Sequence, residues 1–153
     1  MKLLFVCTGN TCRSSMAEVL ARQIAAEAGI TEYEFLSAGT WASPGSPASD
    51  HARRVISEYG LDLESHRATL LTRGLTEEAE LILTMTAAHK EQVLQLFPAA
   101  QGKVYTLLQF GHGQAGDVAD PYGGDINTYR LAAAQIRRVL NGVISRLSEK
   151  NRR

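Results

Sequence analysis

The chain has 153 residues, and its 16 Lys and Arg residues balance its 16 Asp and Glu residues, so the formal net charge at pH 7 is zero. This balance gives no general electrostatic attraction to nucleic acid or to an anionic membrane surface, and we expect neither as a partner. The length and a hydrophobic content of 44% suit one globular domain over residues 1–153, with residues 149–153 as a frayed basic tail.

The first predicted elements are a strand, a tight turn and a helix. Leu3 to Val6 is a short apolar run typical of a central strand in a parallel sheet, so Cys7 lies at the carboxyl end of that strand. From Ser14 onward, apolar residues recur at helical spacing until Gly29 supplies a stop signal. The loop between them places backbone N–H groups at the open start of a helix, where unpaired donors and the helix dipole attract an anion.

The residue types in this loop suggest a nucleophile beneath a bound anion. Gly9 permits a tight turn, and Arg13 can fold back and hold two oxygens of the anion with its planar guanidinium. In such surroundings a thiol has a pKa of roughly 3.5–7.5, so Cys7 is predicted to be a thiolate that attacks phosphorus. The alternative is an ordinary buried strand cysteine. The order of Gly9, Arg13 and Ser14 between a strand and a helix favours the nucleophile.

Beyond this loop, strand-like and helix-like segments alternate. Short apolar runs predict three further strands, at residues 33–37, 80–85 and 103–107. Helical spacing and turn signals predict three further helices, at residues 48–59, 87–97 and 126–147. Loops are expected at residues 39–47 and 111–124, and a mostly irregular segment at 61–73. This alternation predicts an α/β fold with a parallel sheet between helices, in which ligands bind at the carboxyl ends of the strands.

Several separated motifs carry a resemblance to a known family. The sequence Cys-Thr-Gly-Asn-Thr-Cys-Arg-Ser at residues 7–14, followed by Met-Ala-Glu at 16–18, resembles the signature of the low-molecular-weight protein tyrosine phosphatases. The resemblance continues through Ser-Ala-Gly at 37–39, Ser-His-Arg-Ala at 65–68 and Asp-Pro-Tyr at 120–122. It implies a single three-layer domain with four parallel strands in the order 2-1-3-4. It also implies two-step hydrolysis of a phosphorylated protein through a phosphocysteine.

The resemblance also assigns roles to individual residues. The predicted phosphate-binding loop, which should also accept sulfate, comprises Thr8, Gly9, Asn10, Thr11, Cys12, Arg13 and Ser14. Hydrogen bonds that hold the turn of this loop are expected from Asn10, Ser14, Ser37 and His66, and the Ser14 hydroxyl should also reach the thiolate. The alternative for His66 is a solvent-facing loop histidine. His51, His89 and His112 have no match to the family pattern, and we expect them at the surface.

The second cysteine, Cys12, has two interpretations. The resemblance implies a reversible disulfide with Cys7 that protects the thiolate from irreversible oxidation. The alternative is a small packing residue. Because the chain has no third cysteine to relay a disulfide, we set aside a thiol-dependent arsenate reductase. No pair of residues has the spacing of metal ligands, so we predict no metal and no other cofactor.

A proton donor is needed for the leaving group, and a positioned carboxylic acid typically adds about 10²–10⁴-fold to the rate. Asp117 and Asp120 are both candidates by position. The Asp-Pro-aromatic match to the family favours Asp120, which would then activate water in the second step. An acid of this kind argues against a phosphocarrier module that keeps its phosphocysteine for a partner protein.

The chain departs from the family pattern at Ser15, where proline is usual, at Gly123, where a second aromatic residue is common, and at Thr11. Tyrosine-directed members usually carry a bulky aliphatic residue at the position of Thr11, whereas threonine resembles the branch that acts on phosphoarginine. We therefore expect a protein-arginine phosphatase, with a tyrosine phosphatase as the alternative. Trp41 and Tyr122 are candidate side walls of the pocket.

The apolar run at the amino terminus is too short for a secretion signal, and no small residue precedes Cys7. We therefore expect a cytoplasmic protein.

Overall fold

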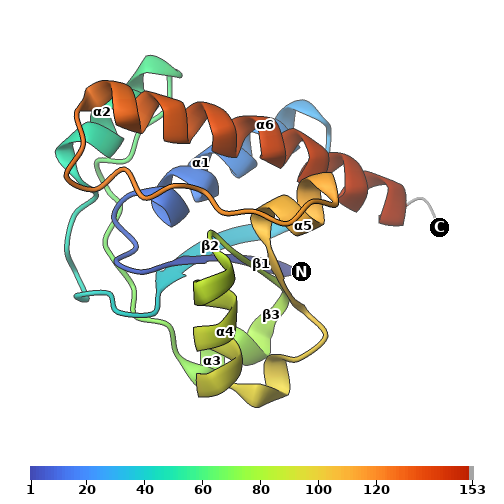
Figure 1. The fold of residues 1–153 in the computed structure, drawn as a ribbon. Helices are drawn as coiled ribbons and strands as arrows, with labels where there is room; N and C mark the ends of the chain where they lie inside the picture. The colour runs from blue at the N-terminus through green and yellow to red at the C-terminus, as the bar shows by residue number, and fades with distance from the viewer. Residues whose placement is uncertain (152–153) are drawn as a thin grey trace.

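The computed structural model describes residues 1–151 and contains one sheet (Figure 1). Its four strands are all parallel and lie in the order β2-β1-β3-β4, which confirms the predicted topology. Their bounds are β1 (Lys2–Cys7), β2 (Glu34–Gly39), β3 (Ala79–Thr84) and β4 (Val104–Thr106). In the register of β1 with the edge strand β2, Cys7 pairs with Gly39, so the nucleophile candidate stands at the carboxyl edge of the sheet.

Helices cover both faces of the sheet, which makes three layers (Figure 1). One face carries α1 (Arg13–Glu27), α2 (Asp50–Glu58), α5 (Leu107–His112) and α6 (Ile126–Asn151). The other face carries α3 (Arg73–Glu78), α4 (Ala87–Leu96) and the short 3₁₀ helix η1 (Pro98–Ala100). Two separate hydrophobic clusters fill the spaces between these layers.

Strand β1 is buried on both faces, which explains its continuous apolar sequence. Leu3, Phe5 and Cys7 point into the cluster beneath α1 and α6, and Leu4 and Val6 point into the cluster beneath α4. Because successive side chains of a strand face opposite ways, a purely alternating pattern would have left one of these two cores without apolar residues from β1.

The fourth strand is shorter than predicted, because a helix starts inside the predicted range 103–107. The hydroxyl of Thr106 accepts a hydrogen bond from the N–H of Gln109 at 3.1 Å and caps α5. Helix α5 then crosses α6 very closely: a Cβ atom added at Gly142 would lie 2.3 Å from the carbonyl oxygen of Gly111. Only glycine at position 142 permits this approach of the two backbones.

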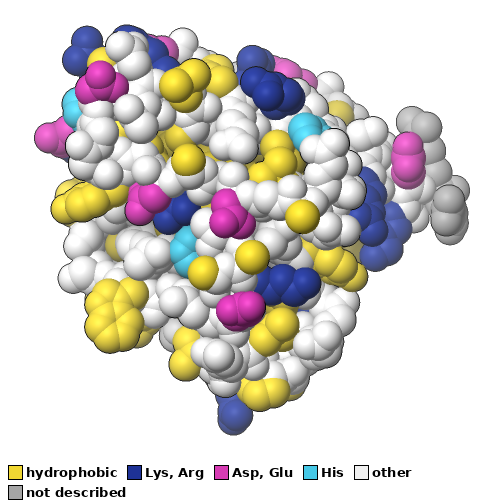
Figure 2. Space-filling view, viewed as in Figure 1, with side chains coloured by type: hydrophobic (Ala, Val, Ile, Leu, Met, Phe, Trp, Pro, Cys, Tyr) yellow, Lys and Arg dark blue, Asp and Glu magenta, His cyan; other side chains and the backbone are white. Residues whose placement is uncertain are grey.

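Other differences are small. Helix α3 begins at the last residue of the irregular segment predicted at 61–73 and was not expected. Helix α6 extends to Asn151, three residues into the predicted tail, and residues 152 and 153 lie outside the described part of the chain. Acidic, basic and hydrophobic side chains are interspersed on the face shown in Figure 2. Within residues 1–151, no helix is both long and apolar enough to span a membrane.

Candidate active site

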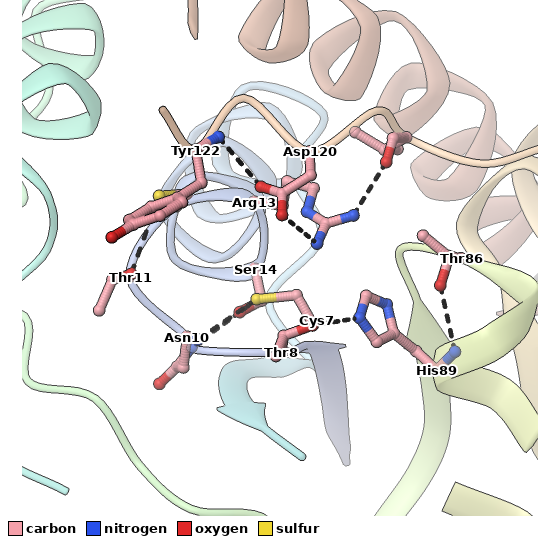
Figure 3. Close-up of polar contacts among 12 residues, drawn as sticks. Cys7, Thr8, Asn10, Thr11, Arg13, Ser14, Thr86, His89, Asp120 and Tyr122 are labelled. Carbon is pink, nitrogen blue, oxygen red and sulfur yellow. Dashed lines mark hydrogen bonds and ion pairs between the residues drawn. The ribbon is translucent and has the colours of Figure 1, made fainter. Parts of the chain in front are cut away.

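The candidate site forms where β1 ends and α1 begins (Figure 3). Cys7 is 3% exposed, and its Sγ lies 2.9 Å from the Ser14 Oγ and accepts the backbone N–H of Asn10 at 3.3 Å. Helix α1 has Cys12 at its N-cap position, and this side chain makes no capping hydrogen bond. The N–H groups of the first helical turn therefore have no side-chain cap and are available to an anion.

Asn10 holds the turn of the loop. It is fully buried, and its backbone has a φ of +58°, a left-handed conformation that asparagine tolerates better than most residues. Its side-chain nitrogen, Nδ2, donates to the Oγ atoms of Ser14 at 2.8 Å and Ser37 at 2.9 Å. Its side-chain oxygen accepts the N–H of Thr69 at 2.9 Å, and its carbonyl lies 2.7 Å from the Nε2 of His66.

Two sequence expectations about this turn now have a structural answer. The structure brings Asn10, Ser14, Ser37 and His66 into one hydrogen-bonded network, and Ser37 passes it on by donating to Glu18 at 2.9 Å. The special backbone conformation falls at Asn10 and not at Gly9, whose φ is not in the left-handed region. A Cβ atom at Gly9 would make only an ordinary contact, 3.6 Å from the Thr11 Oγ1.

The pKa of Cys7 differs from the expectation. Burial raises the pKa of the Cys7 thiol above its ordinary value. The hydrogen bonds from Ser14 and Asn10 and the charge of Arg13 each lower this pKa, but together they do not offset burial. The prediction of a lowered pKa is therefore wrong. Its error has a physical cause: the polar loop sequence does not reveal that the sulfur lies in the core.

Arg13 and Asp120 face each other on the same side of the Cys7 sulfur (Figure 3). The Arg13 side chain is almost entirely buried; its Nη1 donates to the carbonyl of Val118 at 3.0 Å, and its Nη2 lies 3.6 Å from the Asp120 Oδ2. The other carboxylate oxygen of Asp120 accepts the N–H of Tyr122 at 3.1 Å. The guanidinium is thus oriented by the backbone of the same segment that carries the carboxylate.

Asp117 lies elsewhere. Its Oδ1 accepts the N–H of Ala87 at 2.9 Å, at the first residue of α4. It does not line the pocket that contains Cys7 and Asp120. The structure therefore distinguishes Asp120, which lines the pocket, from Asp117, which does not, whereas in the sequence the choice depended on the family motif.

Cys7, Arg13 and Asp120 share one pocket of about 210 Å³. Its other lining residues are Thr8, Gly9, Thr11, Cys12 and Tyr122. Trp41, the second predicted side wall, does not line this pocket; it lines a neighbouring hollow that shares Thr8 with it. Among the described residues, no group of three His, Cys, Asp or Glu side chains is placed to hold a metal ion.

Cys12 lies at the edge of the pocket as a free thiol. Its Sγ is 3.4 Å from the Ser49 Oγ and 3.4 Å from the Tyr129 hydroxyl, so it packs between α2 and α6. Burial raises the pKa of Tyr129 to about 12, so this phenol stays neutral near neutral pH. These contacts are those of a small packing residue, the second interpretation of Cys12. The reversible disulfide with Cys7 stays a prediction.

His89 was wrongly expected at the surface. It is 4% exposed, and its Nε2 lies 2.8 Å from the Thr8 Oγ1, so it links α4 to the predicted phosphate-binding loop. Burial and the charge of Arg13 lower the pKa of His89 to about 4. The sequence gives no local signal of this burial, because position 89, three residues after the N-cap Thr86, is compatible with either a buried or an exposed side chain. Among the other two, His51 is half-buried against Tyr129 and His112 is exposed.

The family model described as low molecular weight phosphotyrosine protein phosphatase matches residues 2–153. The chain belongs to this family. It is 43% identical to the protein-arginine-phosphatase of Geobacillus stearothermophilus, over 97% of this chain and 95% of that protein. It is 40% identical to the protein-arginine-phosphatase of Bacillus subtilis (strain 168), over 99% of this chain and all of that protein. A solved structure of a YwlE arginine phosphatase mutant with a phosphorylated active-site serine is 38% identical and has a TM-score of 0.95, covering 99% of both chains.

Proposed function

We propose that this protein is a cysteine-dependent protein phosphatase that hydrolyses phosphoarginine in proteins in two steps. The observation that carries the proposal is the single pocket in which the Cys7 thiol, the Arg13 guanidinium and the Asp120 carboxyl meet. This pocket opens at the uncapped start of α1. A cation and free helix N–H donors around a small pocket suit a phosphoryl group, and we expect phosphate and sulfate to bind there as well.

In the first step, the Cys7 sulfur attacks phosphorus as a thiolate. The S–P bond forms while the bond from phosphorus to the leaving nitrogen breaks, and Asp120 gives its proton to that nitrogen. Arg13 and the loop N–H groups hold the phosphoryl oxygens as charge develops on them. Burial raises the pKa of the Cys7 thiol, whereas the hydrogen bonds from Ser14 and Asn10 and the charge of Arg13 lower it and so favour the attacking thiolate.

In the second step, water hydrolyses the phosphocysteine. The Asp120 carboxylate takes a proton from the attacking water, the S–P bond breaks, and phosphate leaves. The hydroxyl of Ser14, 2.9 Å from the sulfur, can donate a hydrogen bond to the departing thiolate. The Asn10 network fixes that hydroxyl, because the Asn10 side chain donates to the same oxygen at 2.8 Å.

Two features support arginine as the phosphorylated residue. Thr11 lines the pocket and brings a hydroxyl to it, 3.8 Å from the Cys12 sulfur, and once Asp120 has given up its proton its carboxylate can pair with the departing guanidinium. The two bacterial relatives described above are named protein-arginine-phosphatases.

The alternative substrate is phosphotyrosine, which the family description names. Tyr122 lines the pocket and is 80% exposed, so its ring could stack against a phenol. Gly123 removes the second aromatic surface that would complete such a wall. A more remote alternative is a phosphocarrier that does not hydrolyse its phosphocysteine, and the position of Asp120 in the pocket argues against it.

Replacing the nucleophile tests the proposed reaction. Cys7→Ser should reduce hydrolysis of phosphoarginine peptides, phosphotyrosine peptides and p-nitrophenyl phosphate to background, while inorganic phosphate still binds in a calorimetric titration. Substantial remaining hydrolysis would refute the assignment of Cys7. In the wild type, rapid phosphorylation of Cys7 without release of phosphate would instead support the phosphocarrier alternative.

Replacing Thr11 tests the substrate class. Thr11→Val removes only the hydroxyl and should lower kcat/KM for a phosphoarginine peptide by roughly tenfold, as expected for one lost hydrogen bond. The same change should leave the phosphotyrosine peptide of matched sequence nearly unaffected, and Thr11→Ile should shift the preference toward tyrosine. If neither variant changes the ratio of the two kcat/KM values, the interpretation of Thr11 is wrong.

A further inference from the structure

A second hollow of about 440 Å³ lies directly beside the catalytic pocket. Its lining residues are Thr8, Thr40, Trp41, Gln92, Gln95 and Leu96, and we call it the Trp41 hollow. Thr8 lines both hollows, so they adjoin at this residue, at the carboxyl edge of the sheet.

Hydrogen bonds connect both sides of the Trp41 hollow to the start of the predicted phosphate-binding loop. On one side, the N–H of Thr40 donates to the carbonyl of Cys7, and the N–H of Trp41 donates to the carbonyl of Thr8, both at 2.9 Å. On the other side, the Thr8 hydroxyl lies 2.8 Å from His89 of α4, the helix that also supplies Gln92, Gln95 and Leu96. The hollow therefore keeps a fixed position relative to Cys7.

The lining of the hollow suits an apolar side chain with a polypeptide backbone. Trp41 is 84% exposed and Leu96 is 58% exposed, so two large apolar side chains face solvent on opposite sides of it. Among the described residues no charged side chain lines it, and the amides of Gln92 and Gln95 can hydrogen-bond to peptide groups. Single exposed apolar residues are common on protein surfaces. Two of them in a hollow that adjoins a candidate active site at Thr8 indicate a binding surface.

We propose that the Trp41 hollow is a subsite for the phosphorylated protein substrate, and that it accepts a large apolar side chain close in sequence to the phosphorylated residue. The inference rests on the proposed phosphatase function. The pocket around Cys7 holds about 210 Å³, enough for the phosphorylated side chain but not for its neighbours along the chain. A flanking residue that crosses Thr8 reaches the Trp41 hollow. The lack of lining charges selects an apolar residue over an acidic or basic one.

Steady-state kinetics with paired peptides tests this subsite. One peptide series carries Leu or Phe next to the phosphorylated residue, the other carries Ser there, and p-nitrophenyl phosphate serves as a substrate too small to reach the hollow. The wild type should prefer the apolar peptides by roughly tenfold in kcat/KM, as expected for burial of one large apolar side chain. Trp41→Ala and Leu96→Ser should each remove most of that preference and leave turnover of p-nitrophenyl phosphate unchanged.

Leu131 provides the matched control, because it is similarly exposed, at 73%, but lies on α6 away from the site. Leu131→Ala should leave every rate unchanged. Equal kcat/KM values of the wild type for the apolar and Ser peptides would overturn the subsite, and so would an equal loss on p-nitrophenyl phosphate in Trp41→Ala. The proposed function fails in a different way, namely if the wild type hydrolyses neither the peptides nor p-nitrophenyl phosphate.

A fluorescence titration tests the same contact without altering the hollow. Trp41 is the only tryptophan of the chain, so the intrinsic emission reports on its surroundings alone. In the Cys7→Ser variant, an apolar phosphopeptide should shift the emission to shorter wavelength as it covers the ring, whereas inorganic phosphate and the Ser peptide should not. No shift at a peptide concentration that saturates binding by calorimetry would overturn the proposal.

Discussion

The starts of α1 and α4 make an instructive comparison. Both helices begin at the carboxyl edge of the sheet, α1 after β1 and α4 after the adjacent strand β3. At α4, the hydroxyl of Thr86 accepts the N–H of His89 at 3.1 Å, and the carboxylate of Asp117 accepts the N–H of Ala87 at 2.9 Å. At α1, the N-cap residue Cys12 supplies no such acceptor.

The difference shows how neighbouring helix starts come to serve stability and binding. A hydroxyl at the N-cap contributes about 0.5–2 kcal/mol to helix stability, and α2, α3, α4 and α5 all have one, from Ser49, Thr72, Thr86 and Thr106. Helix α1 forgoes this contribution, and its loop is held instead by the network of Asn10. The first-turn donors of α1 therefore remain for a ligand, whereas those of α4 are used within the fold.

The two nearby aspartates provide the largest test of this comparison. Asp120→Asn should lower kcat by about 10²–10⁴-fold, because it removes the proton donor and the base for water. Asp117→Asn should leave kcat within about twofold and instead lower the free energy of unfolding by roughly 1 kcal/mol, because it weakens the contact with the start of α4. Steady-state kinetics and urea unfolding of both variants separate the roles. If kcat falls only in Asp117→Asn, the two assignments are reversed.

The buried imidazole of His89 predicts a pH dependence of stability. Its pKa in the folded protein is lowered to about 4, whereas in the unfolded chain it lies near 6.5. Between pH 6.5 and 4 the unfolded chain therefore binds more protons, and the free energy of unfolding falls as the pH falls through this window. After discounting for solvent screening, the loss is on the order of 2 kcal/mol.

Urea unfolding of the wild type and of His89→Gln at several pH values from 7.5 to 4 checks this prediction. Glutamine does not titrate, so the free energy of unfolding of the wild type minus that of His89→Gln should decrease as the pH falls. A difference that stays constant over this range would mean that the His89 pKa is not lowered in the folded protein.

The smallest expected effect concerns the cap of α4. Thr86→Ala should lower the free energy of unfolding by about 1 kcal/mol through loss of the bond to the His89 N–H, and Thr86→Ser should restore it. Hydrolysis of p-nitrophenyl phosphate by Thr86→Ala should remain close to that of the wild type, because Thr86 does not line the pocket. A drop in activity comparable to that of Asp120→Asn would contradict the conclusion that the start of α4 serves stability while the start of α1 serves binding.

Much of this arrangement could be predicted from local sequence. The run Leu3 to Val6 is continuous because both faces of β1 are buried, and it marked the central strand correctly. The loop after it carries its chemistry within a few residues, so its position was also predictable. The start of α5 was missed because Thr106, its cap, lies inside an apparently regular strand.

Properties set by tertiary contact were not predictable in this way. The burial of His89 depends on how closely α4 approaches Thr8, and the raised pKa of Cys7 depends on the core that packs around its sulfur. Trp41 was predicted as a candidate side wall of the pocket but lines the neighbouring hollow, because the turn after β2 sets the direction of its side chain. Each of these errors concerns a side chain whose surroundings come from distant parts of the chain.

The close crossing at Gly142 has a consequence far from the pocket. The segment that bears Asp120 leaves directly from the end of α5, and α5 rests on α6 where the backbone of Gly111 meets Gly142. Any side chain at position 142 would wedge these two helices apart and carry the base of that segment with it. The strain of a larger residue would therefore fall on the junction of α5 and α6, whereas Asp120 is anchored separately, because the N–H of Val118 donates to the carbonyl of Met85 at 2.8 Å.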